Sequence, residues 1–452
     1  GMNSRLERAA DGSLHENVWR ADGMYGAAIR QIVQMLSQAI PYAENERQQS
    51  VIRKLIEFYE TGNLAVFDAY TILWVEETEG KVDFTNGFTE VYGDPLGLKA
   101  SWEGYVNYTD HQATRRAQAL SRNAQWFEDH SPVDARFKKP LCRGVSAKVI
   151  NAAILGGDLY PSSAIGINLP NSNWVRAEHG SKSVTIANLT HAYDEAARGN
   201  GFRNEFADST QTVSMMDRYG SICDDLHTDL HECLGHGSGR LLPGVDPDAL
   251  KAYGSTIEEA RADLFGLYYL ADEKLVELGL TPCQEAYKAQ YYSYMMNGLL
   301  TQMVRIQPGH QIEEAHMRNR ALIARWTLEH YPQAVRLSEQ DGKHYVEILD
   351  YPLLRTAFGN LLAEIQRIKS EGDLQAARQM VERYGVQIDA KLHQEVLERY
   401  SKLNLAPYKG FINPRYTPVC DSEGRITDVH IDYLETYDEQ MLRYSKQYNT
   451  LI

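Results

Sequence analysis

The sequence predicts a mainly α-helical protein with a smaller mixed α/β part. Over long stretches, apolar residues recur at spacings of three and four, the period of a helix with one buried face. Segments that read as strands are few and short. The chain has 452 residues, of which 43% are hydrophobic, so it can bury a substantial core in two or three domains or in one large bilobed unit.

The elements follow from the same patterns, taken in chain order. Helices are predicted over three N-terminal segments and one C-terminal segment: residues 25–40, 44–59, 63–74 and 374–403. Strands are predicted within three segments: residues 81–92, 146–168 (around the apolar run 149–155) and 426–432. No internal repeat or low-complexity linker separates them.

The most informative segment is residues 231–236, His-Glu-Cys-Leu-Gly-His. Two histidines can bind a metal, and the intervening glutamate can take a proton from an attacking water, as in His-Glu-x-x-His peptidases. Here the histidines are one residue further apart, and positions five apart on a regular helix diverge by roughly 140°. Either the motif is accidental, or a one-residue π-type bulge returns His236 to the face of His231. Gly235 would ease such a bulge because it adds no Cβ.

A second acidic segment follows the histidine pair. Ser255 or Thr256 is predicted to begin a helix, with Glu258 or Glu259 in the capping-box position, and the helix continues through the apolar residues 264–270. An acidic residue on the inner face of a buried helix, after a metal-type histidine pair, indicates a third ligand. Asp263 lies one turn beyond Glu259 and is expected to orient a ligand histidine.

With these two elements the chain resembles the dipeptidyl peptidase III family of zinc-dependent exopeptidases. The resemblance implies that His231, His236 and Glu259 bind one zinc ion per chain and that Glu232 is the catalytic base, with Glu258 left as a neighbour. The short spacing between the two elements is similar to the bacterial branch of the family.

Two segments resemble the family's substrate-binding elements. Residues 86–95 are similar to a strand and turn, implying that Glu90 binds the free α-amino group of the peptide and that Tyr92 donates to the developing oxyanion. Residues 166–171 resemble an Asn-x-Pro-Asn element, implying that Asn168 and Asn171 hold the peptide's amino end. Without the resemblance, the first pair would read as one solvent-facing side of a strand and the asparagines as turn residues.

Residues 314–320 resemble a helix that supplies a transition-state histidine and a nearby substrate-binding arginine, here His316 and Arg320. Taken alone, a histidine in an amphipathic helix is by default a core residue whose ring nitrogens have hydrogen-bond partners.

The resemblance also implies a bilobed architecture, in which a helical zinc lobe faces a discontinuous second lobe across a cleft. The expected helical catalytic lobe comprises residues 111–146 and 196–407, and the partial mixed α/β lobe comprises residues 1–110, 147–195 and 408–452. Much of the family's usual N-terminal region is expected to be missing, which would leave the cleft wall incomplete.

Charge and cysteine usage exclude several classes of protein. A formal net charge of −15 argues against nucleic-acid binding, which needs basic patches. No apolar run approaches the roughly 18 residues that a membrane span needs. The five cysteines show no Cys-x-x-Cys spacing and are expected to be reduced thiols. With no signal-peptide pattern, a cytoplasmic location is predicted. Short peptides are the expected partners, and no obligate protein partner is inferred.

The sequence therefore predicts a zinc-dependent metallopeptidase that removes dipeptides from the free N-terminus of short peptides. An aminopeptidase or a short-peptide endopeptidase with the same metal chemistry is the alternative among enzymes. A catalytically idle, zinc-containing peptide-binding protein is the alternative of another class, and an ordinary helical protein without metal is the last.

Overall fold

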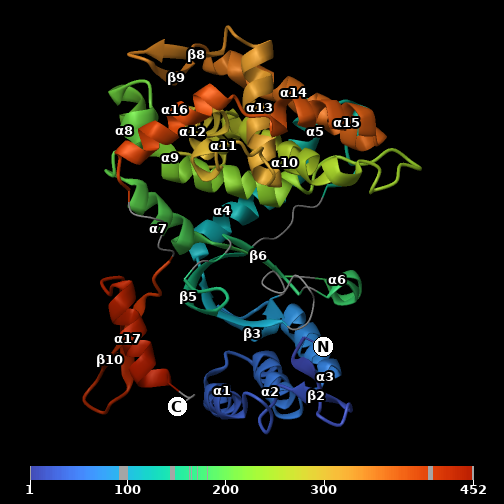
Figure 1. The fold of residues 1–452 in the computed structure, drawn as a ribbon, viewed down its shortest axis with the longest axis vertical. Coiled ribbons are helices and arrows are strands. Elements are labelled where there is room, and N and C mark those ends of the chain that lie inside the picture. The colour runs from blue at the N-terminus through green and yellow to red at the C-terminus, as the bar shows by residue number, and fades with distance from the viewer. Residues whose placement is uncertain are drawn as a thin grey trace. The chain divides into compact units, whose positions relative to one another are not determined.

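The structure is a computed structural model, and the chain in it forms two compact units (Figure 1). It describes residues 2–90, 100–142, 148–161, 163, 165–170, 172–180, 182–405 and 411–449. The first unit, the sheet unit, comprises Gly1–His111, Lys148–Ala192 and Tyr408–Ile452. The second, the helical unit, comprises Gln112–Ala147 and Tyr193–Pro407. The predicted fold class, mainly α with a smaller mixed α/β part, is confirmed.

A five-stranded mixed sheet organises the sheet unit. Its strand order is β3 (Val82–Glu90), β4 (Ser101–Thr109), β5 (Lys148–Gly157), β7 (Lys182–Ile186) and β6 (Gly166–Leu169). The β3–β4, β4–β5 and β6–β7 pairs are antiparallel, whereas β5 and β7 are parallel. The strands β3 and β6, in which Glu90 and Asn168 lie, therefore form the two edges of the sheet.

Three N-terminal helices complete the main core of this unit, as the apolar spacing predicts. They are α1 (Gly26–Ala39), α2 (Glu46–Thr61) and α3 (Leu64–Glu76), with the short 3-10 turn η1 (Ile40–Tyr42) after α1. Asn45 and Asn63 cap α2 and α3 by accepting hydrogen bonds from backbone N–H groups of the first turn. Gly62 ends α2 at a φ of 68°, a left-handed conformation that glycine adopts without strain. Aromatic side chains fill the core, among them Trp19, Phe58, Tyr59, Tyr70 and Trp74.

The remaining elements of the sheet unit are short. They are β1 (Ser4–Arg8), β2 (Leu14–Val18), α6 (Asn173–His179), β10 (Arg415–Cys420), β11 (Ile426–Asp432) and α17 (Tyr437–Tyr448). The strand predicted over residues 426–432 is confirmed as β11, which pairs with β10 in a two-stranded hairpin. Helix α7 (Ala187–Ala197) continues from this unit into the helical unit.

Helix α10 is the centre of the helical unit. It packs against α9, α13 and α14, and most of its residues are buried, including the charged Arg261 and Asp263 (Figure 1). The long helices are α9 (Thr210–Leu230), α10 (Gly254–Leu270), α12 (Tyr287–Leu299), α13 (Ala315–His330) and α14 (Tyr351–Glu371). No helix in the described part of the chain is long and apolar enough to cross a membrane.

Shorter segments surround these helices. They are α4 (His111–Arg122), α5 (Ala124–His130), η2 (Ala135–Phe137), α8 (Phe202–Phe206), η3 (His231–Gly235), η4 (Lys251–Tyr253), α11 (Glu273–Glu277), η5 (Thr301–Arg305), the hairpin β8 (Val335–Gln340) and β9 (Lys343–Ile348), α15 (Leu374–Met380), η6 (Val381–Val386) and α16 (Ala390–Lys402).

Two helix predictions need correction. The single helical region predicted over residues 374–403 is divided into α15, the π turn η6 and α16. Asp389 explains the division, because its carboxylate accepts hydrogen bonds from the N–H groups of Lys391 and Leu392 and so begins a new helix.

The second correction concerns the start of α10. The helix begins at Gly254, directly after the 3-10 turn η4, and no side chain caps it. The capping box predicted for Ser255 or Thr256 with Glu258 or Glu259 is therefore wrong. Neither glutamate therefore caps the helix, and both instead contact the histidines of the site described below.

Candidate metal centre

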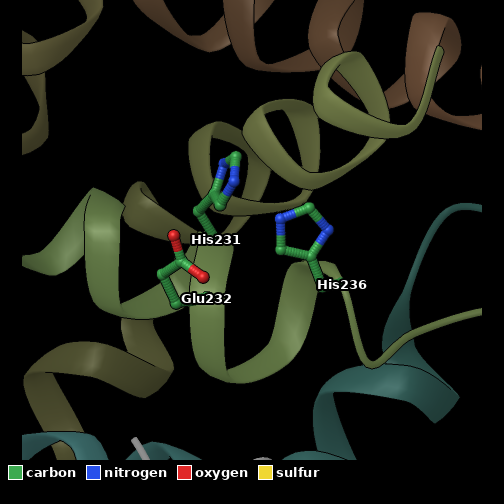
Figure 2. A group of neighbouring side chains, drawn as sticks. All are labelled: His231, Glu232 and His236. Atoms are coloured by element: carbon green, nitrogen blue, oxygen red, sulfur yellow. The ribbon is translucent and has the colours of Figure 1, made fainter. Parts of the chain in front are cut away.

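The segment that carries the two histidines is a π turn. The N–H of His236 donates to the carbonyl oxygen of His231 over 3.0 Å, a bond between residues five apart. This bond pattern returns the fifth residue to the face of the first, so both histidines share one face of the helix (Figure 2). The predicted π-type bulge is confirmed.

Close packing against α10 requires glycine at position 235. A Cβ built on Gly235 would lie 2.9 Å from both the Cα and the carbonyl oxygen of Ala262, a residue of α10. Glycine therefore lets the π turn approach the backbone of α10, the helix that bears Glu258, Glu259 and Asp263.

The side chains of His231, Glu232 and His236 gather at this turn (Figure 2). One nitrogen of each histidine and one carboxylate oxygen of Glu232 all lie within 4.8 Å of one another. The two imidazole rings are nearly perpendicular, with centroids 4.6 Å apart. Glu232 thus lies beside the histidine pair, where a proton acceptor for a metal-activated water would be needed.

Glu259 brings a second carboxylate to the pair from α10. Its Oε2 lies 3.3 Å from His231 Nε2 and 3.9 Å from His236 Nε2. That oxygen is buried and accepts no hydrogen bond from any residue that the structure describes. A buried carboxylate oxygen without a partner is costly, and histidine nitrogens surround this one.

The opposite nitrogen of His231 is anchored by Asp263. His231 Nδ1 lies 2.8 Å from Asp263 Oδ1. The other carboxylate oxygen, Oδ2, accepts hydrogen bonds from Tyr294 on α12 and Asn319 on α13, at 2.7 and 2.8 Å. The carboxylate is therefore held by residues of two helices, α12 and α13, and in turn fixes the ring of His231.

His236 is anchored in the same way by Glu258, a residue that the sequence left as a neighbour. His236 Nδ1 lies 2.8 Å from Glu258 Oε1. The carboxylate of Glu258 also accepts hydrogen bonds from Arg261 and Lys369. A sequence signal existed, since Arg261 follows Glu258 by three residues, the spacing of a helical ion pair.

The residues of this site fit a zinc ion. Each histidine contacts a carboxylate through Nδ1, which leaves Nε2 for a metal, the arrangement typical of zinc-binding histidines. Two imidazoles with the partnerless oxygen of Glu259 form a His₂Glu donor set.

The charges of the site favour a cation. Burial lowers the pKa of His231, but the carboxylates of Asp263 and Glu259 outweigh burial and raise that pKa to about 10. Burial raises the pKa of Asp263, yet its hydrogen bond with His231 holds that pKa well below the usual value. Burial likewise raises the pKa of Glu259, but its interaction with the His231 ring lowers that pKa overall. The negative charges that retain a proton on His231 would equally retain a divalent cation, whose binding releases that proton.

His316 lies at the edge of this cluster, in the first turn of α13. Its Nε2 is 3.5 Å from Glu259 Oε2, and its Nδ1 is 2.7 Å from Glu314 Oε1. The side chain is 55% exposed, so the alternative of a satisfied core histidine is wrong. Glu314 also caps α13 by accepting from the N–H groups of His316 and Met317, which fixes where the helix and its histidine begin.

Arg320 lies one turn further along α13 and is half-buried. Within the described residues its guanidinium makes no hydrogen bond or ion pair, and its charge helps to lower the pKa of Asp263. Sequence reasoning missed Tyr294 and Asn319, which no local motif marks, because their roles arise only from the packing of α12 and α13 against α10.

The other predicted residues belong to the sheet unit. Glu90 ends β3 opposite Ser101, and Asn168 lies in β6 opposite Ser183. Tyr92 and Asn171 lie outside the described residues, as do the side chains of Glu90 and Asn168. The roles of these four residues stay predictions.

Comparisons with known proteins identify the family of the chain. The model of peptidase family M49 matches residues 4–251 and 246–401. The chain is 27% identical over 311 residues to dipeptidyl peptidase 3 of Dictyostelium discoideum, covering 61% of this chain and 43% of that protein. It is 24% identical over 431 residues to dipeptidyl peptidase 3 of Mus musculus, covering 86% of this chain and 57% of that protein.

A solved structure shows the same fold. DPP III from Caldithrix abyssi matches with a TM-score of 0.74 at 20% sequence identity, covering 91% of this chain and 74% of that one. The chain spans about half the length of the curated relatives named above. The family predicted from the sequence is confirmed: the chain belongs to peptidase family M49.

Proposed function

We propose that this chain is a zinc-dependent metallopeptidase that removes dipeptides from the free N-terminus of short peptides. The observation that carries the proposal is the pair of histidines on one π turn, each tied to a carboxylate through Nδ1, with Glu232 between them and Glu259 beside them. Membership of a peptidase family and relatives named dipeptidyl peptidase 3 support it.

The proposed zinc ligands are His231, His236 and Glu259. When bound, zinc polarises the scissile carbonyl and makes a water molecule acidic near neutral pH. The histidines would bind the metal as neutral imidazoles, because Asp263 and Glu258 accept hydrogen bonds from their Nδ1–H groups and so leave each Nε2 unprotonated.

The protein groups then handle protons and charge. Glu232 accepts a proton from the attacking water and later gives it to the leaving amine. His316 and Tyr92 donate to the oxygen on which negative charge develops, an interaction that is stronger in the transition state than in the bound peptide. His316 is suited to this role, because its exposed ring lies beside Glu259.

Substrate selection is assigned to the other predicted residues. Glu90, Asn168 and Asn171 of the sheet unit anchor the free amino end of the peptide, and Arg320 of the helical unit contributes to peptide binding. An anchor for the α-amino group two residues from the cleaved bond makes dipeptides the product. In this proposal the helical unit is the catalytic lobe and the sheet unit supplies the amino-terminal anchor.

Product analysis tests the proposal directly. The zinc-loaded protein is incubated with one short peptide in two forms, with a free and with an acetylated N-terminus, and products are identified by mass spectrometry. Dipeptides from the free form alone are expected. Glu232→Gln should retain zinc but lose hydrolysis; hydrolysis at the wild-type rate would refute the assignment of the base.

The same experiment separates the alternatives. Single amino acids would indicate an aminopeptidase, and internal cleavage of both forms would indicate an endopeptidase. Peptide binding without cleavage, with zinc bound, would indicate a catalytically idle peptide-binding protein.

A further inference from the structure

Two cationic side chains bind the backbone at the end of the π turn that carries both histidines (residues 231–236, here called the metal turn). A helix end leaves carbonyl groups without helical partners. Arg261 Nη1 donates to the carbonyl oxygens of Gly235 and Ser238 over 2.7 and 3.0 Å. Its Nη2 donates to the carbonyl of His236 over 3.3 Å, and Lys139 donates to the carbonyl of Gly237. All four successive carbonyls, from residue 235 to residue 238, therefore accept from a cationic side chain.

Arg261 also holds the carboxylate that orients His236. Its Nε and Nη2 donate to Glu258 Oε2 and Oε1 over 3.0 and 2.7 Å, and Glu258 Oε1 faces His236 Nδ1. Arg261 is 0% exposed. One rigid, planar side chain thus joins the backbone of the metal turn to the carboxylate partner of its second histidine.

We propose that Arg261 is a positioning residue that holds the π turn and the His236 ring in the arrangement that binds zinc. A regular α-helical turn at this place would move His236 roughly 140° away from His231. The carbonyl oxygens of residues 235, 236 and 238 point at a fixed guanidinium, so relaxation to the regular helix would break these bonds. The inference rests on the proposed function for its metal and is independent of the proposed dipeptide products.

Lysine is the informative substitution at this position. An ammonium group has three donors on one atom, whereas the guanidinium presents five in a fixed plane. Arg261→Lys keeps the positive charge beside Glu258. It removes the set of hydrogen bonds that one guanidinium makes at the same time to the backbone carbonyls and to both oxygens of the Glu258 carboxylate. A change in metal binding would therefore report the geometry of the Arg261 hydrogen bonds rather than the positive charge of the side chain.

Arg399 offers a matched control in the same unit. It is 3% exposed and likewise donates to a carboxylate and a carbonyl, namely Glu205 Oε1 over 2.8 Å and the carbonyl of His344 over 2.7 Å. It lies on α16 and makes no hydrogen bond to the metal turn. Arg399→Lys therefore disturbs a buried arginine network without disturbing the proposed zinc site.

The test compares Arg261→Lys and Arg399→Lys in the full chain. Zinc affinity is measured by competition with a chelator, the visible absorption of the cobalt-loaded protein reports ligand geometry, and Tm is measured without metal. Both variants should lower Tm. Only Arg261→Lys should weaken zinc binding, by about 10- to 100-fold, and alter the cobalt spectrum. Wild-type zinc affinity and an unchanged spectrum in Arg261→Lys would overturn the inference.

A milder variant decides the question if Arg261→Lys does not fold. Ser238 Oγ accepts from Arg261 Nη1 over 2.5 Å and donates to the carbonyl of Gly235 over 2.8 Å. Ser238→Ala should weaken zinc binding about three- to tenfold. Unchanged zinc affinity would overturn the inference that Arg261 positions the metal turn. A wild-type protein that binds no zinc would instead refute the proposed function, an outcome distinct from equal binding by wild type and variant.

Discussion

Replacing Gly235 with alanine tests whether close packing of the π turn against α10 assembles the metal centre. The added Cβ would lie 2.9 Å from two backbone atoms of Ala262 and 3.0 Å from its Cβ. Backbone atoms cannot rotate away, so the turn and α10 must separate by about 0.5 Å to restore ordinary contact. That separation moves His231 and His236 away from Glu259.

The size of the effect follows from two opposing contributions. Overpacking of this kind costs about 1–3 kcal/mol, whereas alanine in place of glycine within a helix returns about 0.5–1 kcal/mol. Gly220 provides the matched control, because it lies in α9 with nothing within 4 Å of an added Cβ. Gly220→Ala should therefore stabilise the protein by about 0.5–1 kcal/mol. The difference between the two variants isolates the cost of the contact with Ala262.

Urea unfolding of the metal-free proteins measures the stability difference, and chelator competition measures zinc affinity. Gly235→Ala should be less stable than Gly220→Ala by about 1–3 kcal/mol. It should also bind zinc at least about tenfold more weakly, the equivalent of 1.4 kcal/mol, whereas Gly220→Ala should bind zinc as the wild type does. Equal stability and equal zinc affinity in the two variants would refute the reasoning.

Three further predictions concern individual side chains. Asp263→Asn should weaken zinc binding about 10- to 100-fold in a chelator competition, because the carboxylate no longer holds the His231 ring; unchanged affinity would contradict that role. His316→Ala should lower kcat by about 10²- to 10³-fold, while Tm and zinc content stay at wild-type values because the ring is exposed. A fall in zinc content would show that it serves the metal instead. For Glu205, burial raises the pKa, but hydrogen bonds from Lys343 and Arg399 lower it below 4.5 overall. The ionised carboxylate therefore stabilises the fold above pH 4.5, and this stabilisation is lost as the pH falls through the folded pKa. The Tm deficit of Glu205→Gln should accordingly be larger at pH 7 than at pH 4, and a deficit independent of pH would contradict the ion-pair explanation.

Much of the metal centre could be predicted from the sequence, because its main residues lie close together along the chain. The five-residue spacing of His231 and His236 required a π turn if both were to face one metal, and the structure contains that turn. Helical periodicity likewise predicted α1, α2 and α3, and alternation predicted β11. These signals are local, so a single sequence displays them.

Two other local signals did not lead to correct predictions: one hairpin turn was missed and one helix cap was predicted wrongly. Asp341 and Gly342, both with positive φ, form the tight turn between β8 and β9, and Asp-Gly is a strong hairpin signal. The capping-box pattern at Ser255 and Thr256 was misleading, because the preceding 3-10 turn η4 already leads into α10.

The sequence by itself determined the family, the mainly helical class and the histidine pair with Glu232, since each rests on residue type and short spacing. The sequence also indicated Glu259 and Asp263, and only the tertiary structure decided the other contacts around that pair. Glu258, Arg261, Tyr294 and Asn319 acquire their contacts from α10, α12 and α13, which come together through buried apolar faces. Apart from the Glu258–Arg261 ion pair, which has a helical three-residue spacing, no spacing encodes these contacts. They depend on which helix faces pack against each other, and the burial of the whole helical unit fixes that choice.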